Sequence, residues 1–209
     1  MGSQKSIIWP SLGDELGEYK RYLKGKVLNA GSGIPVGERD ISSHISGELY
    51  NLDIFEHELI QITSPLHDIP CADEYFNAVF CNAVIEHVSN PVEVVRELYR
   101  ILKPGGYLYL AVPFLQPEHL CPDDFQRYTS NGLKKLVEDA GFRLLKTGGV
   151  HNVYHTIGWV IEEWLCSSRS LRNAVLKAIL FPLLRYLSRN SSEYVHSISS
   201  VYRVIAIKD

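Results

Sequence analysis

Residues 27–33 of the chain read VLNAGSG, and this stretch decides the fold. Its apolar beginning is typical of a buried parallel strand, and the run stops at Gly31. Two glycines that alternate with small residues let the backbone approach a ligand closely and leave its N–H groups available to that ligand. The same residues also suit a tight turn that binds nothing. The stretch therefore predicts a strand whose end is either a ligand site or a plain turn.

Apolar runs and helical repeats alternate along the rest of the chain. Short apolar runs predict strands at residues 26–30, 48–54, 60–63, 76–81, 107–113, 142–145 and 200–207. Apolar residues at helical spacing predict helices at residues 91–102, 130–140, 156–166 and 171–187. This alternation indicates an α/β fold with a layered, mostly parallel sheet.

The last two predicted strands are separated by residues 150–199, which is longer than a usual connection. We expect residues 1–209 to form a single domain, with 150–199 as a helical insert before the last strand. The insert would be a lid over the substrate, an assembly surface or a membrane-facing patch. Its segment ILFPLLRYL at residues 179–187 would be the contact site on an anionic membrane surface.

Composition narrows the class of protein. With 45% hydrophobic and 22% charged residues, the chain has the usage of an ordinary globular protein. Its formal charge of −3 gives no electrostatic argument for a nucleic-acid partner. Its four cysteines lack metal-binding spacing, its first residues do not resemble an export signal, and no run reaches the roughly 18 apolar residues of a membrane span. We therefore expect a cytoplasmic protein with free thiols and no transmembrane segment.

Acidic residues follow two further strands, at the edge where open α/β sheets bind ligands. Asp53 comes 20 residues after Gly33, and a carboxylate there can accept hydrogen bonds from both hydroxyls of a ribose. Asp68 follows the third strand, where it either holds an adenine edge or makes a turn before Pro70. A dinucleotide fingerprint needs a third glycine where this chain has Val36, which disfavours that kind of site.

Five segments carry a resemblance to a known family: VLNAGSG, YNLDI, HDIP, FNAVFCNAVIEHV and RELYRILKPGGYLYLAVPF. In order and spacing they resemble the class I S-adenosylmethionine-dependent methyltransferases, and most closely the type 11 methyltransferase group. The resemblance covers about residues 24–147 and the final strand. It implies a Rossmann-like, seven-stranded, mostly parallel sheet with helices on both faces, and S-adenosylmethionine as the cofactor.

The resemblance also implies a set of cofactor-binding residues: Asn29, Ala30, Gly31, Ser32, Gly33, Leu52, Asp53, Ile54, Asp68, Ile69 and Asn82. In the family the glycine loop faces the methionine part of the cofactor, the acid at position 53 holds the ribose, and residue 82 approaches the sulfur. One position departs from the family pattern, because Asn29 stands where an acidic residue usually receives the methionine ammonium. An amide oxygen accepts a hydrogen bond but supplies no charge.

Methyl transfer from a sulfonium needs a positioned acceptor and sometimes the removal of a proton, but no covalent intermediate. The candidates for the catalytic role are His119, His87 and Tyr128. Arg127 and His119 are candidates for binding the substrate, with the alternative that Arg127 pairs with a neighbouring aspartate in its loop. We expect no bound metal, because the i, i+4 pair His151 and His155 lacks a clear third ligand.

These observations predict an enzyme, an S-adenosylmethionine-dependent methyltransferase. It would act at oxygen or nitrogen of a small-molecule or sugar- or lipid-linked acceptor, with no nucleic-acid partner and with peripheral membrane contact as one role of the insert. One alternative is a non-catalytic protein of the same fold that binds S-adenosylmethionine or a nucleotide. A less favoured alternative is an NAD-dependent oxidoreductase. The pattern indicates neither the acceptor nor the oligomeric state.

Overall fold

A mixed β-sheet runs through the computed structural model, which describes residues 12, 16–17, 19–192 and 194–209. Its strands are β1 (Lys24–Ala30), β2 (Ser46–Asp53), β3 (Ile62–Thr63), β4 (Phe76–Asn82), β5 (Leu102–Pro113), β6 (Arg143–Gly149) and β7 (Val201–Ile207). They form one seven-stranded sheet in the order β3-β2-β1-β4-β5-β7-β6. The first five strands of that order are parallel, and β7 runs antiparallel to both of its neighbours. The predicted Rossmann-like sheet is confirmed, while the first eleven residues, where we expect no export signal, lie outside the described part.

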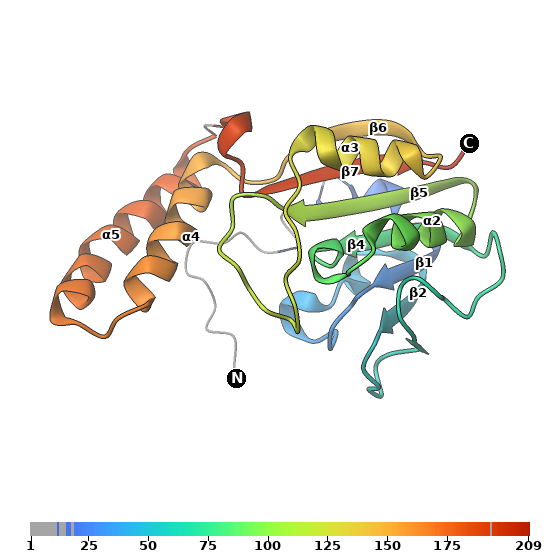
Figure 1. Ribbon diagram of the computed structural model, residues 1–209, viewed down its shortest axis with the longest axis horizontal. Coiled ribbons are helices and arrows are strands. Elements are labelled where there is room, and N and C mark those ends of the chain that lie inside the picture. The colour runs from blue at the N-terminus through green and yellow to red at the C-terminus, as the bar shows by residue number, and fades with distance from the viewer. Residues whose placement is uncertain (1–11, 13–15, 18, 193) are drawn as a thin grey trace.

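Four α-helices of the described chain accompany the sheet: α2 (Pro91–Ile101), α3 (Ser130–Asp139), α4 (Val153–Cys166) and α5 (Leu171–Asn190). Helices α2 and α3 lie side by side on one face of the sheet (Figure 1). Helix α2 begins as the sequence predicts, because the Asn90 side chain accepts a hydrogen bond from the N–H of Glu93 and Pro91 occupies the first turn. Its apolar stripe, which includes Leu98, is buried against the sheet.

The other face of the sheet is covered by a different set of segments. Tyr19 and Leu23, beside the short 3₁₀ turn Lys20–Tyr22, and Ile41, between the turns Gly37–Arg39 and Ser42–His44, are buried against β1 and β5. The chain between β1 and β2 thus makes 3₁₀ turns, and its polar residues favour turns over a long helix. The carboxyl ends of β1, β2 and β4 are left next to one another, which is where such sheets bind ligands.

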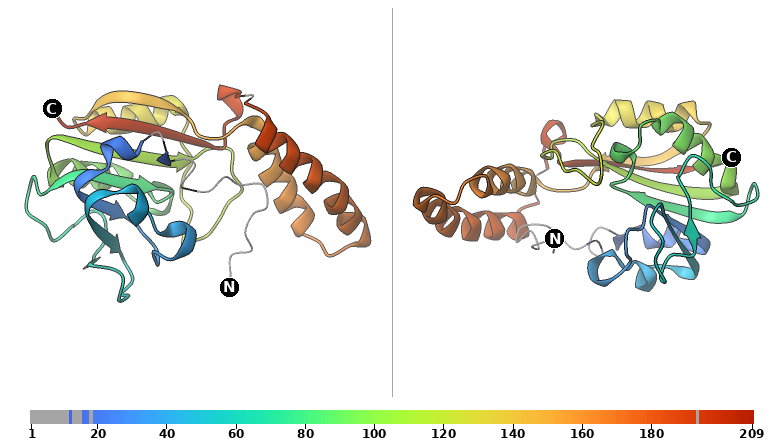
Figure 2. Two further views of the ribbon diagram at one scale, coloured as in Figure 1. Left: turned by 180° about the vertical axis from the view of Figure 1, so that it is seen from behind. Right: turned by 60° about the horizontal axis from the view of Figure 1, so that its bottom comes forward.

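The predicted insert forms a helical hairpin, α4 and α5, that projects from the end of the sheet (Figures 1 and 2). The two helices pack mainly on each other. Five large apolar side chains are exposed along one side of α5 at helical spacing: Leu171, Val175, Ile179, Leu183 and Tyr186. No helix among the described residues is long and apolar enough to cross a membrane.

Candidate functional site

A cavity of about 840 Å³ opens at the carboxyl ends of β1, β2 and β4. Its size lies within the range of sites for small molecules and cofactors. Eight of the predicted cofactor-binding residues line it: Asn29, Gly31, Ser32, Gly33, Leu52, Asp53, Ile54 and Asn82. Two of the predicted catalytic residues, His87 and His119, line the same cavity. The tertiary structure therefore brings most of the predicted site together.

The loop after β1 is fastened to the end of β2. The N–H groups of Gly31 and Ser32 both donate to the carbonyl oxygen of Leu52, each over 2.9 Å. The N–H of Gly33 donates to Oδ2 of Asp53 over 2.8 Å. The expectation that this loop leaves its N–H groups available to a ligand is wrong, because the neighbouring parallel strand uses them. Because Gly31 and Gly33 have no side chains, a ligand in the cavity can still approach the backbone of this loop closely.

Gly31 is required by both its conformation and its surroundings. Its φ of +69° lies in the left-handed region, and a Cβ atom there would lie 2.6 Å from both methyl groups of Val84. Val84 belongs to the loop after β4 and also lines the cavity. The two loops therefore touch across the strand ends and fix the floor of the cavity.

Asp53 combines a structural role with spare capacity for a ligand. Besides the bond to Gly33, its Oδ1 accepts the N–H of Phe55 over 3.3 Å. A carboxylate offers about four lone-pair sites, so two remain after these bonds. The side chain lines the cavity and can still accept hydrogen bonds from a pair of vicinal hydroxyls.

Asn29, at the position of the family's acidic residue, is almost fully buried. It faces Asn51 across the parallel register of β1 and β2, and its Nδ2 donates to Oδ1 of Asn51 over 2.9 Å. Asn51 is held in turn by Leu59 and Gln61. The amide hydrogens of Asn29 are thereby directed at β2, and the amide oxygen is the acceptor that this residue has for a ligand.

The loop after β3 reaches the cavity through other residues than predicted. Asp68 and Ile69 do not line the cavity, and Ile69 is buried in the core. The Ile69 N–H donates to Oε1 of Glu97 over 2.8 Å, and Arg100 donates to the Ile69 carbonyl over 3.0 Å. These hydrogen bonds attach Ile69 to α2. Pro65, Leu66 and His67 line the cavity instead. Ala30, also in the predicted set, is buried in the core and does not line the cavity either.

A cluster of Glu86, His87 and His119 stands at one wall of the cavity. Glu86 is fully buried, and within the described residues neither of its carboxylate oxygens receives a hydrogen bond. The Nε2 atoms of His87 and His119 each lie 3.6 Å from the same oxygen, Oε1. This proximity to Glu86 raises the pKa of His119 above its usual value, although burial opposes the shift.

The two remaining predicted residues, Arg127 and Tyr128, are near this cluster but do not line the cavity. Arg127 forms a two-point ion pair with Asp124 and also donates to the Pro117 carbonyl. The alternative that Arg127 pairs within its loop is the one observed, and Arg127 does not line the cavity. Tyr128 does not line it either, and burial, with a smaller contribution from Glu86, raises its pKa to about 12. A phenol that holds its proton so firmly is a poor base at neutral pH.

The histidine pair near the start of α4 does not form a metal site of three ligands in the described structure. His151 contacts Oγ of Ser200 over 2.8 Å, and burial lowers the pKa of His155 to about 4. Both side chains are buried.

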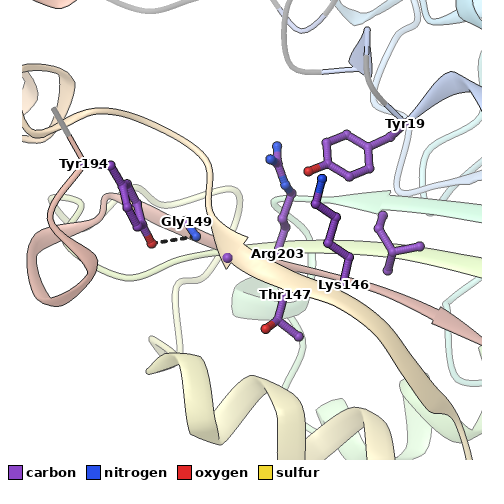
Figure 3. A pocket seen from close by; sticks show the side chains of 8 residues that line it. Tyr19, Lys146, Thr147, Gly149, Tyr194 and Arg203 are labelled. Carbon is purple, nitrogen blue, oxygen red and sulfur yellow. Dashed lines mark hydrogen bonds between the residues drawn. The ribbon is translucent and has the colours of Figure 1, made fainter. Parts of the chain in front are cut away.

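A second cavity, of about 200 Å³, lies at the opposite edge of the sheet, on β6 and β7 (Figure 3). Two cations point into it, but both already face the ring of Tyr19: Lys146 at 5.1 Å and Arg203 at 4.1 Å from the ring centre. Its rim is closed by a hydrogen bond of 2.8 Å from Gly149 N–H to the Tyr194 hydroxyl. The larger cavity is therefore the candidate functional site.

Comparisons with known sequences agree with this location. Residues 30–110 match the methyltransferase-domain family. An 80-residue stretch is 30% identical to the ubiquinone biosynthesis O-methyltransferase of Pseudomonas putida, covering 38% of this chain and 33% of that protein. A 62-residue stretch is 36% identical to the tRNA U34 carboxymethyltransferase of Syntrophotalea carbinolica, covering 28% of this chain and 19% of that protein. The chain thus spans about a third or less of the length of these curated relatives.

Solved structures extend the likeness to nearly the whole chain. A SAM-dependent methyltransferase from Archaeoglobus fulgidus matches with a TM-score of 0.61 at 19% identity, covering 94% of this chain and 93% of its own. The [4+2]-cyclase SpnF matches with the same TM-score at 15% identity, covering 94% of this chain and 80% of its own. At such identities the likeness shows the fold, and the cyclase illustrates that one fold hosts different chemistries.

We expect Asp124→Asn to destabilise the protein by about 2 kcal/mol at pH 7, because Arg127 holds the pKa of Asp124 at about 2, below the ordinary value near 4. A lowered carboxyl pKa stabilises the folded state above the ordinary value, and this contribution is lost as the pH falls toward 2. Urea unfolding at pH 7 and at pH 3 measures the difference, which should shrink at the lower pH. Asp123→Asn, an exposed neighbour, is the control and should change stability by less than about 0.5 kcal/mol. If Asp124→Asn destabilises the protein equally at pH 7 and pH 3, the lowered pKa of Asp124 is contradicted.

Proposed function

The chain carries a class I S-adenosylmethionine-dependent methyltransferase domain, and from that premise we propose that it transfers a methyl group to oxygen or nitrogen of a small-molecule or lipid- or sugar-linked acceptor. The observation that carries the proposal is the convergence of Gly31, Asp53 and Asn82 on one cavity that also holds two histidines. In this proposal Asp53 binds the ribose hydroxyls through its two spare lone pairs. The loop after β1 lies against the methionine part, with the Asn29 amide oxygen as an acceptor for its ammonium.

The chain's contribution to the reaction is the handling of the acceptor. S-adenosylmethionine supplies an electrophilic methyl group, so that no protein nucleophile is needed. His119 and His87 line the cavity and are the groups that can orient an acceptor hydroxyl or amine. Glu86 lies behind both rings and stabilises positive charge that develops there. We do not assign a catalytic role to Tyr128, because its high pKa keeps it protonated.

Two observations help to choose between the classes of acceptor. One relative is by name an O-methyltransferase of ubiquinone biosynthesis, and another modifies tRNA. The formal charge of −3 offers no general attraction for the phosphates of a nucleic acid. We therefore favour a small-molecule or lipid-linked acceptor. The non-catalytic alternative remains the second candidate, because Asn29 lacks the charge that the family uses for the cofactor ammonium.

We further propose that the hairpin of α4 and α5 rests on an anionic membrane surface, where a lipid-linked acceptor would be met. The exposed apolar stripe of α5 is accompanied by four basic residues and no acidic one: Arg172, Lys177, Arg185 and Arg189. Trp164 of α4 and Tyr186 of α5 are exposed as well. Aliphatic, aromatic and basic side chains in this combination favour the interface of anionic lipid bilayers.

Asp53→Ala should weaken S-adenosylmethionine binding by about 1.5–3 kcal/mol, or roughly 10- to 150-fold, because charged hydrogen bonds to the ribose are lost. Isothermal titration calorimetry measures the affinity, and unfolding curves separate it from the loss of the Gly33 contact. Glu56→Ala is the matched control, since Glu56 is an exposed acid of the same loop that does not line the cavity. An unchanged affinity in Asp53→Ala removes Asp53 from the cofactor site.

Asn29→Asp should bind S-adenosylmethionine more tightly by about 1 kcal/mol, because a charged acceptor is worth roughly twice a neutral one. The variant also loses the donor to Asn51 Oδ1, so urea unfolding curves measure the accompanying loss of stability separately. The gain should be absent for 5′-methylthioadenosine, which lacks the amino-acid part of the cofactor. Titration of both ligands against wild type and variant tests this. Equal gains for the two ligands would show that residue 29 does not face the ammonium.

Ile179→Glu should abolish the binding of the chain to vesicles of phosphatidylglycerol, because it places a charge in the middle of the exposed stripe of α5. Vesicle flotation measures binding, with phosphatidylcholine vesicles as the neutral comparison. Val92→Glu, at an exposed position of α2, is the control and should float like wild type. The membrane proposal fails when the wild-type chain stays unbound, or when it binds neutral and anionic vesicles equally.

A further inference from the structure

Glu86, His87 and His119 bring three metal-ligating groups to one point, with one ligand atom from each within 4.8 Å of the others. The Glu86 carboxylate is fully buried, and no hydrogen bond from the described residues reaches it. Burying an ionised carboxylate without donors is costly. A cation held between the carboxylate and the two rings would offset that cost.

The hydrogen bonds of the two rings set the direction of their lone pairs. Nδ1 of His87 lies 2.5 Å from the carbonyl oxygen of Asp123, and Nδ1 of His119 lies 3.2 Å from that of Pro117. A carbonyl only accepts, so each Nδ1 carries a hydrogen, and in the neutral ring the Nε2 atom then presents its lone pair. In that form both Nε2 atoms face Glu86 Oε1 at 3.6 Å, the geometry of three donor atoms around one ion. Backbone carbonyls that fix the far nitrogen are typical supports of metal-binding histidines.

The separations between Glu86 Oε1 and each of the two Nε2 atoms match those of ligands around one ion. Bonds of about 2.1 Å at a tetrahedral angle put two ligand atoms about 3.4 Å apart. The observed separation of 3.6 Å between Oε1 and each Nε2 is close to this value. His87 and His119 line the cavity whereas Glu86 does not, so an ion among them would keep its open coordination position toward the cavity.

We propose that Glu86, His87 and His119 form a site for a divalent cation of the zinc type, whose open position binds an oxygen of the acceptor. Two imidazoles and one carboxylate are a donor set suited to first-row transition metals. Only the second half of the proposal, the role of the cation in holding the acceptor, rests on the proposed function. A protein that methylates such an acceptor would orient the oxygen through the ion, and the histidines would act as ligands.

Equilibrium dialysis of the full chain tests the site, after chelator treatment and with Zn²⁺ as the probe and no other ligand. We expect one equivalent to bind wild type, and Glu86→Gln and His119→Asn each to bind at least about 10-fold more weakly. His119 is partly exposed, so that variant keeps the test valid when Glu86→Gln fails to fold. His67→Asn is the control, because His67 lines the same cavity outside the cluster and should leave binding unchanged.

A Co²⁺ spectrum identifies the donors, since Cys121 also lines the cavity. Bands of nitrogen and oxygen coordination without thiolate charge transfer are expected. Thiolate charge transfer overturns the proposal, as does wild type that binds no cation or variants that bind as tightly as wild type. A chain that binds Zn²⁺ but not S-adenosylmethionine refutes the proposed function and leaves the cation site standing. The converse result refutes the cation site alone.

Discussion

The attachment of the β1 loop to the end of β2 is the constraint on which the rest of the site depends. One carbonyl, that of Leu52, holds the N–H groups of Gly31 and Ser32, and Asp53 holds that of Gly33. These bonds form because the two strands are parallel and in register, so that their ends lie side by side. The same bonds turn the Asp53 carboxylate toward the cavity with lone pairs to spare. The atoms that join the ends of the two strands are thus the ones we propose for binding the ribose.

A second feature of the site is that its two acidic side chains, Asp53 and Glu86, differ in their hydrogen bonding. Asp53 is tied by backbone N–H groups at one end of the cavity, whereas Glu86 is buried without a donor behind the other. An acid with satisfied bonds suits the recognition of neutral hydroxyls. A buried acid without them favours a positive charge beside it, which in our proposal is a cation held between Glu86 and the two histidine Nε2 atoms, each 3.6 Å from Glu86 Oε1. In the proposed function, the Asp53 end of the cavity binds the cofactor and the Glu86 end handles the acceptor.

The insert, which is the hairpin of α4 and α5, lies mostly outside the cavity and its walls. Its apolar side chains cover little of the sheet and face outward along α5, yet Trp159 of α4 lies 6.2 Å from the ring of His119. Helix α4 therefore borders the wall of the cavity that His119 lines, and the hairpin extends away from the sheet (Figure 2).

The sequence by itself determined the sheet, its helices and the identity of the strand ends, because apolar periodicity and glycine turns are local signals. It also indicated Asp53, Asn82 and both histidines, since motif order places them at the carboxyl edge. Only the tertiary structure decided that Ile69 is buried, because Glu97 and Arg100 reach it from a helix 28 and 31 residues away. It likewise decided that Glu86 and His87, in the loop after β4, meet His119, in the loop after β5. Such outcomes depend on which side chains meet across elements distant in sequence, and residue spacing carries no information about that.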